Sequence, residues 1–163
     1  MIIYKDLETL RKFYSIYTKR QIEDNNEAIL INPFYETTHY VRQVLSDTAN
    51  IEVIKYEKEE ALLIIDALKV YFGQEPDRSF KERIAIYVKE IGKNGLSIMN
   101  DIGAFPYKHK DKELVEFELS LPTVFDLPLK RFCIFHQKDF GRLSEKQKQK
   151  LVNHHGMTLT LDK

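Results

Sequence analysis

The sequence predicts an α/β protein, a single domain with a mainly parallel sheet of five to six strands and helices on both faces. Short apolar runs alternate with longer segments of helical period along the chain, which is typical of parallel sheets covered by helices. The 163 residues suit one domain whose core needs no disulfide. A content of 43% hydrophobic and 31% charged residues is ordinary for a globular protein. No repeat or linker divides the chain, so residues 1–163 are expected to fold as one unit.

Apolar periodicity and turn residues predict the elements of the first half of the chain. Leu7, Leu10 and Tyr14 recur at helical spacing, and Asn32-Pro33 closes a buried strand because proline cannot donate to a sheet. Gly73 is expected to end a helix. In order, the predicted elements are a strand over residues 2–4, a helix from 7 to the polar cluster 23–26, a strand over 28–31, a helix over 36–45, a strand over 51–54 and a helix over 59–72.

The second half of the chain continues the alternation. Apolar residues from Phe80 to Ile91 recur at helical intervals and predict a helix that ends at Gly92. Ser144 with Gln147 fits a capping box, which marks the start of the last helix. Besides these, the sequence predicts a strand over 96–99, an exposed loop over 103–111, a helix over 113–121, a strand over 131–135 and a final strand over 157–161.

Charge and cysteine content limit the classes of partner. The chain has 25 basic and 25 acidic residues, whereas nucleic-acid-binding domains usually carry a basic excess, so direct nucleic-acid binding is not expected. Zero net charge weakly favours self-association, and a homodimer is one candidate assembly.

No apolar run reaches the length of a membrane span, and residues 1–10 lack the features of a secretory signal. Cys133 is the single cysteine, which fits a reducing cytoplasm.

The six glycines form no phosphate-binding motif. Neither GxxxxGK[ST] nor GxGxxG occurs, so ATP hydrolysis and dinucleotide binding are disfavoured, and no cofactor is predicted. The local cluster GKNG at residues 92–95 precedes a predicted strand, whereas a phosphate cradle follows a strand and opens a helix.

Two histidine arrangements are interpreted as structural. His154 and His155 are adjacent and lack a CxxC or HExxH partner pattern, so we interpret them as residues that close the last helix before Gly156. Cys133 and His136 lie three apart on a predicted strand and therefore face opposite sides of it, which excludes a catalytic dyad. No catalytic residue and no metal ligand is predicted.

Glu118 differs from the other acidic residues of its predicted helix. Glu113 and Glu116 share one face, while Glu118 lies on a flank about 160 degrees from Glu116. One interpretation is the border of a solvated acidic face. The other is that Glu118 points inward and anchors a polar network or a ligand, since a buried charge requires a partner. The predicted source of the opposite charge is Arg131, Lys138 or His136.

Polar and aromatic residues follow three predicted strands. Tyr35 comes after the second strand, Asn100 and Asp101 end the fourth, and His136 ends the fifth. Parallel strands end at one edge of a sheet, where open α/β proteins bind ligands, so these residues and Glu118 are the predicted ligand-binding set. Residues at strand ends also serve as caps and turns, and that alternative stays open.

Several motifs resemble the MEDS family, the methanogen and methylotroph sensory domain. IYKD at residues 3–6 resembles the family's Tyr-acidic opening, and residues 28–45 resemble its second strand and the helix that follows. Phe117-Glu118 resembles an aromatic-Glu pair in a late helix, and His155 resembles a closing histidine. FCIFHQKDF at residues 132–140 resembles a Cys-x-Tyr strand with a trailing aromatic, at Cys133, Phe135 and Phe140.

The sequence departs from this family at three points. It lacks the histidine that usually precedes the opening tyrosine, Phe135 replaces a tyrosine, and Gly156 stands where proline is common. The resemblance implies a cytoplasmic α/β sensor of small hydrocarbon-derived compounds, of a kind often attached to DNA-binding or kinase modules. It also implies a core similar to RecA- or KaiC-type ATPases, here without a phosphate loop.

Three functions follow as hypotheses. The first is a non-enzymatic sensory or regulatory domain that binds an unknown small organic ligand and signals to a regulatory or signalling protein partner. The second is a protein-interaction or assembly module derived from a RecA- or KaiC-like fold without nucleotide hydrolysis. The third is a small enzyme with an acid-base pair drawn from Glu118, Asp101 and His136.

Overall fold

A computed structural model describes residues 1–73, 88, 90–125 and 128–162 of the chain. All of its strands belong to one six-stranded sheet of order β3-β2-β4-β5-β1-β6, and each neighbouring pair is parallel. The predicted α/β fold with a parallel sheet in one domain is therefore confirmed. The strands are β1 (Ile2–Tyr4), β2 (Ala28–Asn32), β3 (Leu62–Ile64), β4 (Leu96–Asp101), β5 (Leu129–His136) and β6 (Leu159–Leu161).

Side-chain caps begin several of the helices. Asp6 accepts a hydrogen bond from the Thr9 amide at the start of α1, and Ser144 forms the predicted capping box with Gln147 at the start of α9. The helices are α1 (Leu7–Lys19), its π-helical continuation η1 (Arg20–Asp24), α2 (Thr38–Ala49), α3 (Val53–Lys58), α4 (Ala67–Phe72), α6 (Ala104–Tyr107), α7 (Asp111–Ser120), α8 (Gln137–Arg142) and α9 (Glu145–His155). Within the described residues, no helix combines the length and apolarity that a membrane crossing requires.

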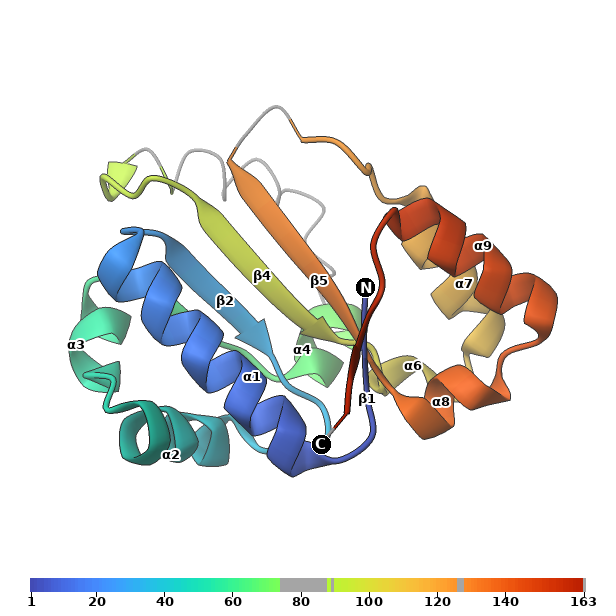
Figure 1. Ribbon diagram of the computed structural model, residues 1–163, viewed down its shortest axis with the longest axis horizontal. Coiled ribbons are helices and arrows are strands. Elements are labelled where there is room, and N and C mark those ends of the chain that lie inside the picture. Colours follow the sequence, from blue (N-terminus) through green and yellow to red (C-terminus); the bar gives the residue numbers. More distant parts are fainter. Residues whose placement is uncertain (74–87, 89, 126–127, 163) are drawn as a thin grey trace.

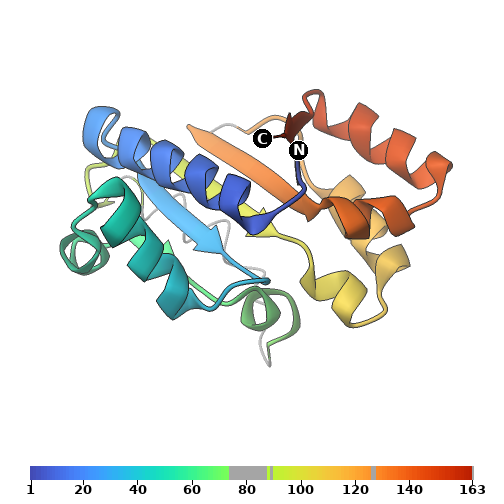
Figure 2. The ribbon, with the colours of Figure 1, turned by 60° about the horizontal axis from the view of Figure 1, so that its bottom comes forward.

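Helices cover both faces of the sheet. In Figure 1, α1 crosses in front of the sheet, and α7 and α9 lie at the side of β5 and β1. Figure 2 shows α1 and α2 over the same face. We call this the first face, and it packs the apolar side chains of Ile29, Met99 and Ile134 against those helices. On the second face, Cys133 and Phe135 of β5 pack against α6, α7 and α9.

The third strand and the helix expected after it are displaced from their predicted positions. Residues 51–54 do not form a strand, and α3 begins at Val53. The strand lies instead at Leu62–Ile64, inside the predicted helix 59–72. Glu60 has a positive φ of 56°, which breaks the helical path, and Leu62 pairs with Ile29 of β2. Pairing along a buried strand thus outweighs the helical spacing of its apolar residues.

Two short helices also differ from prediction. The predicted exposed loop 103–111 contains α6, in which Ala104 and Phe105 are buried. Phe105 packs against the rings of Tyr71, Phe72 and Phe117, and this aromatic contact draws the segment onto the second face. The helix α8 directly follows β5 and was not predicted. The helix predicted from Phe80 lies mostly outside the described residues.

Candidate functional site

Three of the predicted ligand-binding residues meet at the carboxyl edge of the sheet on its first face. The hydroxyl of Tyr4 lies 3.4 Å from Oδ2 of Asp101, and the ring of His136 contacts Tyr4 at 5.0 Å and Tyr35 at 5.3 Å between centroids. Tyr35 donates its hydroxyl hydrogen to Asp139. We call these five residues, Tyr4, Tyr35, Asp101, His136 and Asp139, the strand-edge network.

Polar groups of the strand-edge network bond to one another or to nearby backbone. Asp101 accepts from the Gly103 amide at 2.9 Å, and Nδ1 of His136 accepts from the Lys138 amide at 3.1 Å, which caps α8. Burial raises the pKa of Asp101 to about 7, against the opposing effect of the Gly103 hydrogen bond. Burial likewise raises the pKa of the Tyr4 phenol. The hydrogen bonds of this network therefore hold the segments after β2, β4 and β5 together, which is the structural role of caps and turns at strand ends.

Asn100 and Glu118 lie on the second face and do not join the network. Side chains alternate along a strand, so Asn100 points away from Asp101. Its amide lies 2.6 Å from that of Asn32 and, with its oxygen toward Arg131, accepts from the guanidinium at 3.0 and 3.2 Å. Cys133 pairs in register with Asn100 on the next strand. The five predicted residues thus divide between the two faces of the sheet, with Tyr35, Asp101 and His136 on the first and Asn100 and Glu118 on the second.

Glu118 is fully buried on α7 and faces His155 of α9. Nε2 of His155 lies 3.2 Å from Oε2 of Glu118, in an approach that is not aligned for a hydrogen bond. Neither carboxylate oxygen accepts a well-aligned hydrogen bond from any residue that the structure describes, although the Cys133 thiol and the His155 imidazole both lie beside the carboxylate. The inward orientation of Glu118 agrees with the sequence hypothesis. The side chain that faces it, however, is that of His155 and not that of Arg131, Lys138 or His136 as predicted, because α9 packs directly against α7.

The local structure of α9 directs the His155 side chain. Gly156 ends the helix in the left-handed conformation, with a φ of 63°. Nδ1 of His155 lies 2.8 Å from the carbonyl oxygen of Leu151, one turn earlier, and this contact directs Nε2 toward Glu118. His155 does close the helix, as interpreted from the sequence. Its ring also takes part in a buried polar site, which the sequence interpretation did not include.

Cys133 completes a group of three potential metal ligands. One ligand atom each of Glu118, Cys133 and His155 lies within 4.8 Å of the others, and Cys133 and Glu118 are both buried. Burial, followed by the Glu118 charge, raises the pKa of the Cys133 thiol. The sequence predicted a small core residue at this position and no metal ligands. Burial of the thiol agrees with that interpretation, but the neighbouring carboxylate and imidazole give it a chemical setting that the sequence did not reveal.

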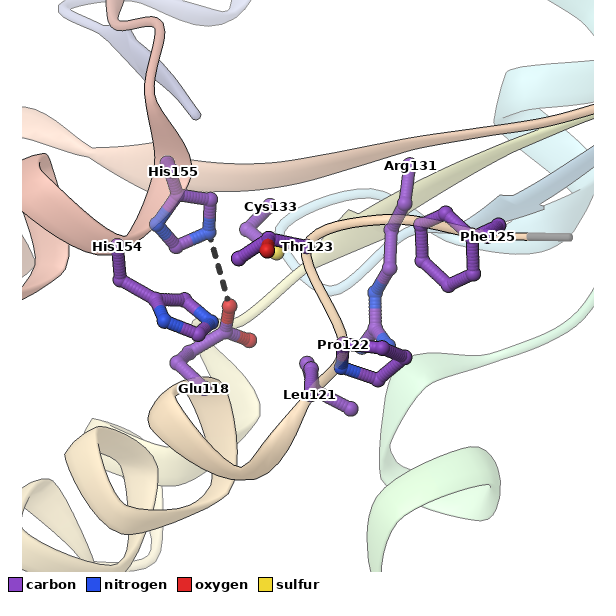
Figure 3. Close-up of a pocket in the computed structure, with 9 residues that line it drawn as sticks. All are labelled: Glu118, Leu121, Pro122, Thr123, Phe125, Arg131, Cys133, His154 and His155. Carbon is purple, nitrogen blue, oxygen red and sulfur yellow. Dashed lines mark ion pairs between the residues drawn. The ribbon is translucent and has the colours of Figure 1, made fainter.

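These residues line a pocket beside α7, β5 and α9. Its volume is about 90 Å³. Figure 3 shows Glu118 and His155 directed toward each other, with Pro122 and Phe125 on the segment that follows α7. We call this cavity the α7–α9 pocket, and it is lined by Glu118, Leu121, Pro122, Thr123, Phe125, Arg131, Cys133, His154 and His155. Charged or polar side chains, among them Glu118, Arg131 and the two histidines, share the lining with the apolar side chains of Leu121, Pro122 and Phe125, a combination that suits a small ligand.

A second buried polar atom lies near the pocket. The hydroxyl of Tyr71 is buried and has no hydrogen-bond partner among the described residues. Burial raises its pKa well above the ordinary value, and the Glu118 charge raises it further. Buried polar atoms are normally paired, and among the unpaired ones in the described residues Glu118 is the one that lines the pocket, which makes the pocket a candidate binding site.

A scan of the chain against protein-family models finds no match, and a search of curated proteins finds none. The resemblance to the MEDS family thus remains a prediction. The motifs that carry this resemblance nevertheless include Glu118, Cys133 and His155, the three residues that meet in the α7–α9 pocket. Helical periodicity and spacing in the sequence had pointed to Glu118 alone.

Proposed function

We propose that this protein is a non-enzymatic sensory or regulatory domain that binds a small organic ligand in the α7–α9 pocket and signals to a protein partner. The observation that carries the proposal is the carboxylate of Glu118, which is fully buried at the pocket and accepts no hydrogen bond from a described residue. Such a group is costly in the free protein, because its desolvation is not offset by hydrogen bonds. A ligand that donates to it would remove that cost.

The pocket sets the size and chemistry of the proposed ligand. A volume of about 90 Å³ is well below that of a pocket for a drug-sized molecule, so the ligand has few non-hydrogen atoms. Its polar end would contact Glu118 and His155, while Leu121, Pro122 and Phe125 would cover its apolar part. A short-chain alcohol, amine or thiol has this combination. The resemblance to a family implied to sense small hydrocarbon-derived compounds supports the same ligand class and a cytoplasmic location.

A path for the signal follows from the position of His155. This residue is the last of α9, and the chain continues from it through Met157 into the edge strand β6. Met157 and Leu159 are exposed apolar side chains next to this connection. A shift of His155 on ligand binding would therefore move a surface that a regulatory or signalling partner can contact.

The proposed alternatives lack comparable support. An acid-base enzyme built from Glu118, Asp101 and His136 requires these groups to share a site, yet Glu118 lies on the second face and the other two on the first. An assembly module requires no ligand and would oligomerise with increasing protein concentration. Sedimentation at several concentrations, with and without ligand, separates that alternative from sensing.

A thermal-shift screen of short-chain alcohols, amines, thiols and carboxylates tests the proposal. A bound ligand stabilises the folded state by mass action, and the melting temperature rises as a result. At a ligand concentration of a hundred times its Kd, the free energy of unfolding increases by about 2.7 kcal/mol. We expect a shift in the wild type and in the control Glu113→Gln, whose residue is exposed on the same helix, and none in Glu118→Gln. Failure of every compound, or an equal shift in Glu118→Gln, would contradict a ligand site at this carboxylate.

A further inference from the structure

We infer that Glu118, Cys133 and His155 form a Zn²⁺ site whose fourth coordination position opens into the α7–α9 pocket. The inference deepens the proposed function, and rests on it for the role of the metal in ligand binding. The site itself follows from the arrangement of three side chains. They come from α7, β5 and α9, so the metal would join three elements that packing alone brings together.

The distances suit a tetrahedral centre after a small adjustment of side chains. Bond lengths of about 2.0–2.3 Å place the ligand atoms of tetrahedral zinc roughly 3.3–3.8 Å apart. In the structure the three ligand atoms lie within 4.8 Å of one another, and Nε2 of His155 is already 3.2 Å from Oε2 of Glu118. A movement on the order of 1 Å would bring the three atoms to coordination distance.

The donor set favours zinc among biological metals. Thiolate sulfur and imidazole nitrogen are preferred zinc ligands, whereas Mg²⁺ and Ca²⁺ prefer sites made of oxygen alone. Three protein ligands with one open position are typical of zinc sites that bind an exchangeable molecule. Here the open position would face the cavity lined by Pro122 and Phe125.

The charges of the group also favour a dication. One Zn²⁺ with one carboxylate and one thiolate has no net charge, which suits a buried position better than a carboxylate that accepts no hydrogen bond does. On binding, the Cys133 thiol would transfer its proton to solvent and its sulfur would bond to the metal. Both unpaired oxygens of Glu118 would then have a cation beside them.

The outer contact of His155 matches that of a metal ligand. Histidines bound to metals commonly donate their other ring N–H to a carbonyl, which fixes the tautomer and the direction of the ring. Nδ1 of His155 lies 2.8 Å from the Leu151 carbonyl, and this leaves the Nε2 lone pair directed at Glu118 and Cys133. A small compound with a lone pair on oxygen, sulfur or nitrogen could take the fourth position, which would define the ligand class more narrowly.

Cobalt titration of untagged, chelator-treated protein tests the site, because Co²⁺ occupies zinc sites and reports on its ligands by absorption. We expect one equivalent to bind and to produce a thiolate-to-cobalt charge-transfer band that Zn²⁺ abolishes by displacement. Cys133→Ser should remove the band, and Glu118→Gln and His155→Ala should each weaken Co²⁺ binding at least about 10-fold. The matched controls are Glu113→Gln and His39→Ala, both at exposed helix positions, and they should bind as the wild type does.

Circular dichroism of each metal-free variant establishes that it is folded before titration. If Cys133→Ser does not fold, Cys133→Ala supplies the same test of the charge-transfer band. Absence of the band in the folded wild type, or its persistence in a folded Cys133 variant, would overturn the zinc site.

Repeating the thermal-shift screen on zinc-loaded and chelator-treated protein separates the two proposals. Cobalt binding without a response to any organic compound would support the metal site and contradict the sensory function. A compound that stabilises both preparations equally, in a protein without the charge-transfer band, would support sensing and overturn the zinc site. A response confined to zinc-loaded protein would support both.

Discussion

The strand-edge network and the α7–α9 pocket contain similar side chains, but the polar groups in them have opposite hydrogen-bonding states. In the network, Asp101 accepts from a backbone amide and lies near the Tyr4 hydroxyl, and Tyr35 donates to Asp139. In the pocket, neither oxygen of Glu118 accepts a hydrogen bond from a described residue. Polar groups that pair with one another stabilise a loop, whereas a buried carboxylate that accepts no hydrogen bond has a desolvation cost that a bound ligand or metal would offset.

His136 and Cys133 show how closely the two regions approach each other in the chain. They lie three residues apart on β5, and strand alternation directs one to each face of the sheet. The ligand-binding set predicted from the strand ends therefore mixed residues of the strand-edge network with Glu118 of the α7–α9 pocket. The two regions contain the same types of residue, and they differ in how their polar groups are hydrogen-bonded.

The largest expected effect is that of His155→Ala on the metal-free protein. This change leaves the buried Glu118 carboxylate without its facing imidazole and removes a largely buried ring, so it should cost about 3 kcal/mol or more. Urea unfolding in the presence of a chelator measures the loss. In a Glu118→Gln background the same change should cost less, with a coupling energy of about 1–3 kcal/mol. Strict additivity of the two changes would show that the two side chains do not interact.

The next effect concerns the pH dependence of stability in the strand-edge network. The pKa of Asp101 is about 7 in the folded protein and has an ordinary value of 3.8. Between about pH 4 and pH 7, Asp101 keeps its proton in the folded state and releases it in the unfolded state. The contribution of Asp101 to the free energy of unfolding therefore falls as the pH rises from about 4 to 7, by about 2–4 kcal/mol in total. Asp101→Asn should remove this component.

Urea unfolding of wild type and Asp101→Asn at pH 5 and pH 8 gives the measurement. The difference in unfolding free energy between the two proteins should shift in favour of the variant at pH 8. If the two pH profiles run parallel, Asp101 is ionised in the folded state and the network is more solvated than its burial indicates.

A smaller loss is expected for Tyr35→Phe, which removes the hydrogen bond to Asp139. The side chain is partly exposed, so water replaces some of the lost interaction and the cost should be about 1.5 kcal/mol. Chemical denaturation measures the cost, and cobalt binding is the control, since the pocket lies across the sheet. A change in cobalt affinity would show that the two regions are coupled.

The smallest effect is that of Ser144→Ala at the start of α9. Loss of the capping box should cost about 1 kcal/mol, measured by thermal unfolding. This helix carries His155, so the change should also weaken ligand or cobalt binding slightly, while Lys146→Ala in the exposed first turn serves as its control. An unchanged melting temperature would mean that packing of Leu151, and not the cap, determines the helix.

Much of the fold followed from local patterns, while the candidate site did so only in part. The strands at 2–4 and 28–31 and the capping box at Ser144 were predicted because each depends on neighbours in the chain. The strand at Leu62 was mistaken for helix, since a short apolar run fits either period and only pairing with β2 decides. Convergence of Tyr35, Asp101 and His136 followed from parallel strand ends.

The sequence alone determined the order of apolar and polar segments, and hence an α/β sheet, but it left open whether Glu118 borders a solvated helix face or points inward. Only the tertiary structure decided that Glu118 meets Cys133 and His155. Those three residues lie on separate elements, and their contact depends on how α7 and α9 pack against β5. Side-chain packing across elements is a long-range property, so local spacing cannot specify which buried polar groups share a pocket or which are left without a partner.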